Sequence, residues 1–183
     1  WNGSGSFESG FTLTPGNLYH LAWVLSNNNV TIYVNGNNVA SGSIAVGSVN
    51  NGPVTIGRDA IGRFLNGRLD EVRIWNVART PAQILANMNC EIVAQPGLVA
   101  AYHFNQGIAS GNNTSETNLA DSSGNGNNGT LANFALAGST SNWVAPGGVI
   151  TGTVCCNVSL TTSASDTLIV CVESGQTLGS VTL

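Results

Sequence analysis

The chain has 183 residues and a formal net charge of −4; only 8% of its residues are charged, and its 5 basic residues are all arginines. Nucleic-acid binding needs a basic face that this composition cannot supply, so we expect no nucleic-acid partner. No apolar run approaches the roughly 20 residues of a membrane-spanning helix, so we expect no membrane span in this fragment. The chain opens on Trp1 instead of Met, as expected of a piece of a longer polypeptide.

Residues 18–43 are typical of an antiparallel meander. Apolar and β-branched residues alternate with polar ones in NLYHLAWVLS and VTIYV, as they do in half-buried strands. The dipeptide Asn35-Gly36 has the residues that a two-residue hairpin turn with positive φ demands. We therefore predict three strands here, and two more over residues 54–58 and 64–76.

One short helix is expected after these strands, over residues 81–88. Thr80 is a favourable N-cap, Pro81 fits the first helical position, and Gln83 completes a capping box. Beyond the helix, residues 97–107, GLVAAYHFNQG, predict a further strand.

The last part of the chain changes in composition. Residues 110–129 are rich in Asn, Gly, Ser and Thr, which is typical of a loop, and Pro146-Gly147-Gly148 is the best candidate boundary. The sequence after it is rich in Thr, Ser and Val and has no aromatic residue. We predict that residues 147–183 are a linker and the first strands of a second β module.

The four cysteines lack the paired C-x-x-C spacing of a zinc site. Three of them lie near the end of the chain, where Cys155 or Cys156 could pair with Cys171 across a hairpin. Such a bond would fit an extracytoplasmic compartment. Unpaired thiols in a bacterial surface protein are the alternative, and the pairing of Cys90 is left open.

The order of pieces over residues 17–88 is specific. A Trp-containing strand is followed by a strand ending in Tyr-Val-Asn-Gly, an Ile-Gly-Arg strand, the stretch GRLDEVRIW and a helix opened by Thr-Pro. This order resembles the C-terminal half of a laminin G-like domain of the concanavalin A-like, pentraxin-like type, found in large surface proteins of Bacteroidota-like bacteria. The resemblance implies an all-β fold, an antiparallel β-sandwich of jelly-roll type with one short helix.

Residues 97–134 are similar to sequences that usually open domains of this family, yet here they follow the helix. They begin another copy of the domain or form an appended hairpin, and we favour the hairpin because few residues follow. We therefore expect one laminin G-like domain over residues 1–146, starting partway through, with residues 97–146 as the appended hairpin.

Asp70 is unusual for a strand residue. Side chains alternate between the two faces of a strand, so Asp70 shares a face with Val72 and Ile74, which are expected to point to a core. A buried carboxylate needs compensation. Asp70 either helps to bind a structural calcium ion, as the resemblance allows, or accepts hydrogen bonds from backbone N–H groups near Gly67.

Asp121 and Asn125 are the other candidate calcium ligands. They lie in the loop DSSGNGNNG, which resembles a calcium loop in its oxygen-bearing side chains and its glycines but lacks the EF-hand spacing. Together with Asp70 they form the predicted metal site. The alternative is a tight Asn/Gly turn that holds no metal.

Glu71, Arg73 and Trp75 alternate with the inward residues and are expected to face outward. They could form a glycan platform, with the indole stacked on a sugar and the charged groups bonded to hydroxyls. The alternative is an ordinary cross-strand packing and ion-pair face. Adjacent Asp70 and Glu71 would point to opposite faces, so they cannot flank a glycosidic bond, and we predict no enzyme activity.

The leading hypothesis is a non-catalytic carbohydrate-binding or adhesion module of a secreted or cell-surface bacterial protein. The family resemblance implies a glycan or a cell-surface protein as partner and calcium as a structural ion. The alternative is an architectural spacer of a surface fibre that contacts neighbouring copies of itself and binds no sugar. The tail rich in Thr, Ser and Val favours that alternative.

Overall fold

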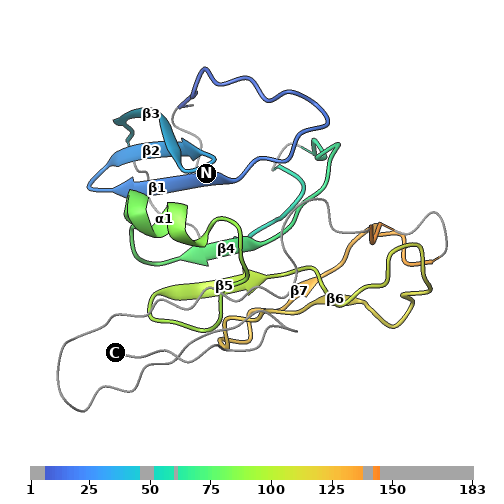
Figure 1. Ribbon diagram of the computed structural model, residues 1–183. Coiled ribbons are helices and arrows are strands. Elements are labelled where there is room, and N and C mark those ends of the chain that lie inside the picture. Colours follow the sequence, from blue (N-terminus) through green and yellow to red (C-terminus); the bar gives the residue numbers. More distant parts are fainter. Residues whose placement is uncertain (1–6, 46–51, 60–61, 138–141, 145–183) are drawn as a thin grey trace, which may run out of the picture. The chain divides into compact units, whose positions relative to one another are not determined.

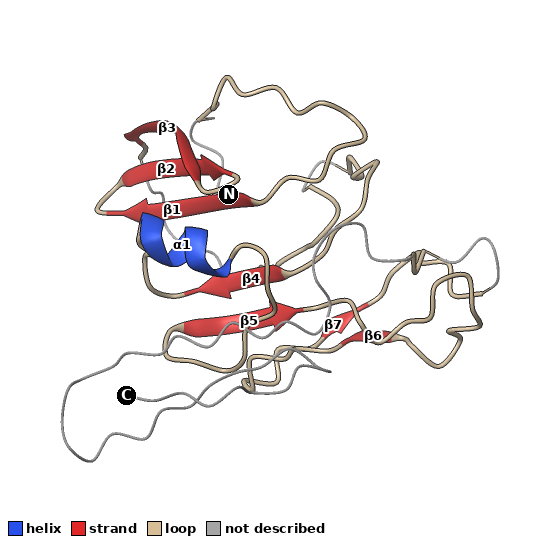
Figure 2. Cartoon of the chain, viewed as in Figure 1, coloured by secondary structure: helices blue, strands red, loops and turns tan. Residues whose placement is uncertain are grey.

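A computed structural model describes residues 7–45, 52–59, 62–137 and 142–144. Within these ranges there are seven strands and one helix, and every strand pairing is antiparallel (Figure 2). The predicted all-β class with one short helix is confirmed.

The chain divides into two compact units. Residues 1–70 and 77–88 form the first, and residues 71–76 and 89–183 form the second. The predicted domain boundary at residue 146, the expected β module over residues 147–183 and three of the four cysteines lie outside the described residues.

The first unit contains a three-stranded meander of β1 (Leu21–Ser26), β2 (Asn29–Val34) and β3 (Asn37–Ser43), paired in the order β1-β2-β3 (Figure 1). Asn35 and Gly36, with φ of 49° and 78°, make the tight turn between β2 and β3. The three strands predicted over residues 18–43 are therefore confirmed.

The helix α1 (Pro81–Asn87) begins as the sequence predicts. The Thr80 hydroxyl accepts a hydrogen bond from the Gln83 N–H, and the Gln83 side chain accepts one from the Thr80 N–H, at 3.3 and 3.0 Å. A Cβ atom on Gly36 would lie 2.8 Å from Leu85 Cδ1. The positive φ favours glycine at position 36, whereas the exposed Leu85 side chain could move to make room for a Cβ atom.

The predictions for residues 54–76 are largely wrong. Residues 54–58 form no strand, only a single bridge between Arg58 and Phe64, and the predicted strand over residues 64–76 is reduced to β4 (Val72–Trp75). Gly57 and Glu71 have φ of 81° and 51°. These left-handed conformations interrupt the extended backbone that a continuous strand needs.

The second unit is built on β4 and β5 (Leu98–Tyr102), which pair antiparallel. Their core consists of Ile92, Leu98 and Ala101, with Trp75 packed against it. The strand expected within residues 97–107 is thus confirmed, in a shorter form.

Two very short strands lie in the region predicted as a loop. They are β6 (Asn118–Leu119) and β7 (Gly129–Thr130), and they pair with each other. The chain between them is the DSSGNGNNG loop. The described residues include no helix of the length and hydropathy that a membrane span requires.

Candidate functional site

The residues of the proposed glycan platform do not face outward together. Glu71 immediately precedes β4, and its side chain is only 7% exposed; that of Arg73 is 10% exposed. Trp75 packs against the core of the second unit. The expected outward orientation is therefore wrong for Glu71 and Arg73, because the left-handed φ at Glu71 ends the strand-like alternation of faces.

Glu71, Arg73 and His103 instead form a largely buried polar cluster. His103 Nδ1 lies 2.8 Å from Glu71 Oε1 and 3.0 Å from Oε2, and Arg73 Nη2 lies 3.0 Å from Glu71 Oε2. Arg73 also donates a hydrogen bond to the backbone carbonyl of Cys90. The Cys90 side chain is part of a disulfide bond. The cluster thus links the start of β4, the residue after β5 and the Cys90 segment.

The cluster favours the protonated form of His103. Its hydrogen bond to Glu71 raises the pKa of the imidazole above the ordinary 6.5, although burial acts in the opposite direction. The negative charges of Glu71 and Glu91 add to the rise, and Arg73 opposes it. Nothing in the sequence places His103 beside Glu71, because the two residues are 32 positions apart in the chain.

The predicted metal residues lie in different units. Asp70 is half-buried in the first unit, whereas Asp121 and Asn125 belong to the second. Among the described residues, no group of three or more His, Cys, Asp and Glu side chains is arranged to hold a metal ion. A shared calcium site therefore stays a prediction.

Asp121 makes hydrogen bonds through both of its carboxylate oxygens. Oδ1 accepts from the N–H groups of Ala101 and Ser123, both at 2.9 Å. Oδ2 accepts from the Ser123 hydroxyl at 2.9 Å and the Asn127 N–H at 2.8 Å. Burial acts to raise the pKa of this carboxyl, but these hydrogen bonds hold it below the ordinary 3.8. Protein donors thus compensate the charge, an arrangement that fits a structural turn better than an oxygen shell around calcium.

The same loop covers one edge of β5 with side-chain amides. Asn125 Nδ2 donates to the carbonyls of Leu98 and Val99 at 2.8 and 3.0 Å, and Asn127 Nδ2 donates to Val99 at 2.9 Å. Since β4 pairs with the other edge, both edges of β5 have hydrogen-bond partners. The Asn residues of the loop act here as a substitute for a neighbouring strand.

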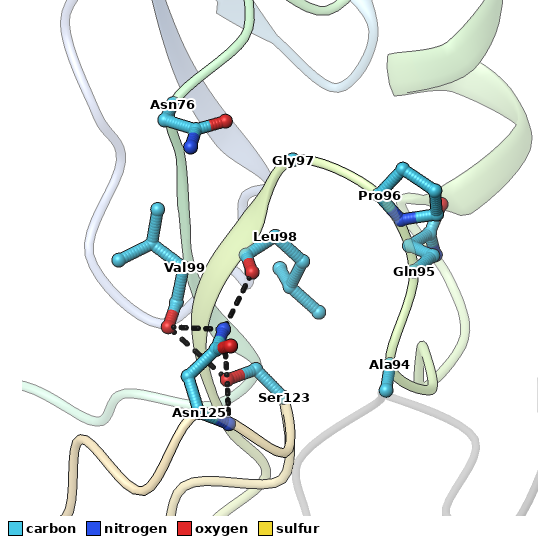
Figure 3. A pocket seen from close by; sticks show the side chains of 9 residues that line it. All are labelled: Asn76, Ala94, Gln95, Pro96, Gly97, Leu98, Val99, Ser123 and Asn125. Atoms are coloured by element: carbon cyan, nitrogen blue, oxygen red, sulfur yellow. Dashed lines mark hydrogen bonds between the residues drawn. The ribbon is translucent and has the colours of Figure 1, made fainter.

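A pocket of about 580 Å³ lies beside the start of β5 (Figure 3). Its walls come from the residue after β4, the turn before β5 and the loop; the lining residues are Asn76, Ala94, Gln95, Pro96, Gly97, Leu98, Val99, Ser123 and Asn125. Asn125 is the one predicted site residue among them. The sequence gives no signal for Asn76 or Gln95, since each is an ordinary polar residue in a connecting segment.

Comparison with known proteins supports the resemblance seen in the sequence. Residues 1–85 match the laminin G family model Laminin_G_3, described as the concanavalin A-like lectin/glucanases superfamily. The recognition of a laminin G-like domain is therefore confirmed over that segment. No curated protein matches the chain.

Two solved structures resemble the chain. A crystal structure of a "putative carbohydrate binding protein" from Bacteroides ovatus is 28% identical, with a TM-score of 0.58 over 71% of this chain and 39% of that chain. An S-layer domain-containing protein from Clostridium thermocellum is 29% identical over 42% of each chain, with a TM-score of 0.31. The second TM-score is too low to establish a shared fold. The chain spans about two fifths of the length of each of these proteins.

Asp121→Ala should destabilise the second unit. The substitution removes the acceptor of the buried Ala101 N–H and three further hydrogen bonds, so we expect the free energy of unfolding to fall by about 1–3 kcal/mol. Chemical denaturation measures this change. The control is Asp59→Ala, which removes the ion pair with the exposed Arg63 side chain and the hydrogen bond from the Arg63 N–H; this change should cost less than the loss of the four hydrogen bonds of Asp121, at about 1 kcal/mol. Equal losses in the two variants would contradict the role of Asp121.

The buried cluster should make stability depend on pH through His103. Folding raises the pKa of His103. The contribution of His103 to the free energy of unfolding is therefore fully present below the ordinary pKa of 6.5, and it is lost as the pH rises through the pKa of the folded state. We expect the thermal midpoint to fall as pH rises above the ordinary pKa of 6.5, and His103→Gln to reduce that fall. Asn38→Ala is the control; it changes no titratable group and should leave the fall in the thermal midpoint as it is. An unchanged pH dependence in His103→Gln would refute the assignment.

Proposed function

We propose that this chain is a non-catalytic carbohydrate-binding module of a secreted or cell-surface protein. The observation that carries the proposal is the likeness to the Bacteroides ovatus protein, which extends over 71% of the chain at a TM-score of 0.58. The lectin/glucanase description of the family matched by residues 1–85 supports the same ligand class. Binding of glycans at a cell surface is also how such a module would take part in adhesion.

Two features of the second unit support binding without catalysis. The pocket beside β5 is lined by amide, hydroxyl and apolar groups with no carboxylate among them. The carboxylates of Glu71 and Asp121 are both hydrogen-bonded to protein donors. A glycosidase needs a pair of carboxyl groups that flank the scissile bond, one of them positioned to protonate the leaving oxygen.

The disulfide of Cys90 supports a location outside the cytoplasm. Disulfides form and persist mainly in oxidising compartments, such as the periplasm and the cell surface. Cys90 itself is buried, with 4% exposure.

A glycan array tests the proposed function. We expect saturable binding to at least one glycan class, and no release of shorter sugars when the bound glycan is incubated with the chain. A heat-unfolded sample serves as the control for non-specific adsorption. Absence of binding both on the array and in solution would refute the proposal, and release of shorter sugars would refute its non-catalytic part.

Calcium dependence is proposed separately and rests on Asp70. We expect a chelator to lower the thermal midpoint by a few degrees, since a bound ion at a hundredfold excess over its dissociation constant stabilises by about 2.7 kcal/mol. Asp70→Ala should abolish the difference, and Asp59→Ala should preserve it. If calcium and chelator give the same thermal midpoint, Asp70 is not a calcium ligand and its carboxylate accepts hydrogen bonds from backbone N–H groups instead.

A further inference from the structure

The pocket beside β5 is a candidate small-ligand site. Its volume of about 580 Å³ lies within the roughly 300–1,000 Å³ that ligand pockets occupy. Three separate segments supply its walls, so that a bound molecule would contact the end of β4, the turn before β5 and the DSSGNGNNG loop together.

Hydrogen bonds hold these walls in place before any ligand arrives. The Asn76 N–H donates to the Gly97 carbonyl at 2.9 Å, and the Leu98 N–H donates to the Gln95 carbonyl at 3.1 Å. Figure 3 shows the Asn125 side chain directed at the carbonyls of Leu98 and Val99. A preformed site loses less conformational entropy when it binds a ligand.

Two carboxamides of the lining are available to a ligand. The side chain of Asn76 is hydrogen-bonded to none of the described residues, and that of Gln95 makes only a long bond of 3.5 Å to the Val93 carbonyl. A carboxamide carries both donors and an acceptor, as a sugar hydroxyl does. Asn76 and Gln95 can therefore each bond to hydroxyl groups.

The lining also discriminates by charge. None of the nine lining residues is ionisable, and Pro96 and Val99 are apolar residues that are not fully buried. An anionic sugar would lose hydration here without gaining a cationic partner, which is costly. An uncharged sugar would place its C–H groups on the apolar surface and its hydroxyls on the amides.

We infer that this pocket binds uncharged, hydroxyl-rich sugars through Asn76 and Gln95. The inference rests on the proposed carbohydrate-binding function and adds to it both the site and the class of ligand. This pocket is a different site from the glycan platform expected from the sequence, because Glu71 and Arg73 of that platform are largely buried.

NMR titration of the whole chain tests the inference, with cellotetraose, xylotetraose and galactotetraose as uncharged probes and tetragalacturonate as the anionic one. We expect at least one uncharged probe to shift the side-chain amide signals of Asn76 and Gln95, and tetragalacturonate to leave them unchanged. The double variant Asn76→Ala/Gln95→Ala should bind that probe roughly tenfold more weakly or worse, because it loses two hydrogen-bonding groups.

Asn38→Ala is the matched control, since Asn38 is an exposed amide outside the pocket lining. It should bind as the unmodified chain does, and both variants should keep the thermal midpoint. Equal binding of tetragalacturonate would overturn the ligand class, and undiminished binding by the double variant would overturn the site; the proposed function would survive either result. A chain that binds no probe and nothing on the glycan array would overturn both proposals.

Discussion

The second unit depends above all on the carboxylate of Asp121. One side chain accepts hydrogen bonds from the strand β5 and from the loop that contains it. This fixes the loop against the edge of β5 and brings Asn125 to the carbonyls of Leu98 and Val99. The pocket wall that Ser123 and Asn125 supply is therefore a consequence of how the Asp121 charge is compensated.

A second compensated charge lies at the end of the β4–β5 pair that is farther from the pocket. Val72 pairs with Tyr102, so the residues just outside that pair, Glu71 and His103, are brought together. Trp75 pairs with Leu98 at the other end, beside the pocket. The cluster of Glu71, Arg73 and His103 stabilises one end of the β4–β5 pair. The other end, beside the pocket, has no charged residue in the pocket lining and is open to a ligand. The two ends thus separate a structural role from the proposed binding role.

The regular parts of the fold follow from local patterns. The meander over residues 18–43 and the helix opened by Thr80 were predictable because alternation, turn residues and caps act within a few residues of the chain. The strand predicted over residues 54–58 and the alternation expected through Asp70 and Glu71 failed. Both depend on backbone angles at Gly57 and Glu71, which a hydrophobic pattern does not encode.

The sequence by itself determined the all-β class, the resemblance of residues 1–85 to the laminin G family, the capped helix and the polar character of the Asp121 loop. Only the tertiary structure decided what the polar side chains do. It buried Glu71 and Arg73 with His103, supplied Asp121 with a hydrogen-bond donor on β5, and placed Asn76 and Gln95 around one pocket. The physical reason is that these contacts join residues far apart in the chain, and strand pairing, not local propensity, brings them within hydrogen-bond distance.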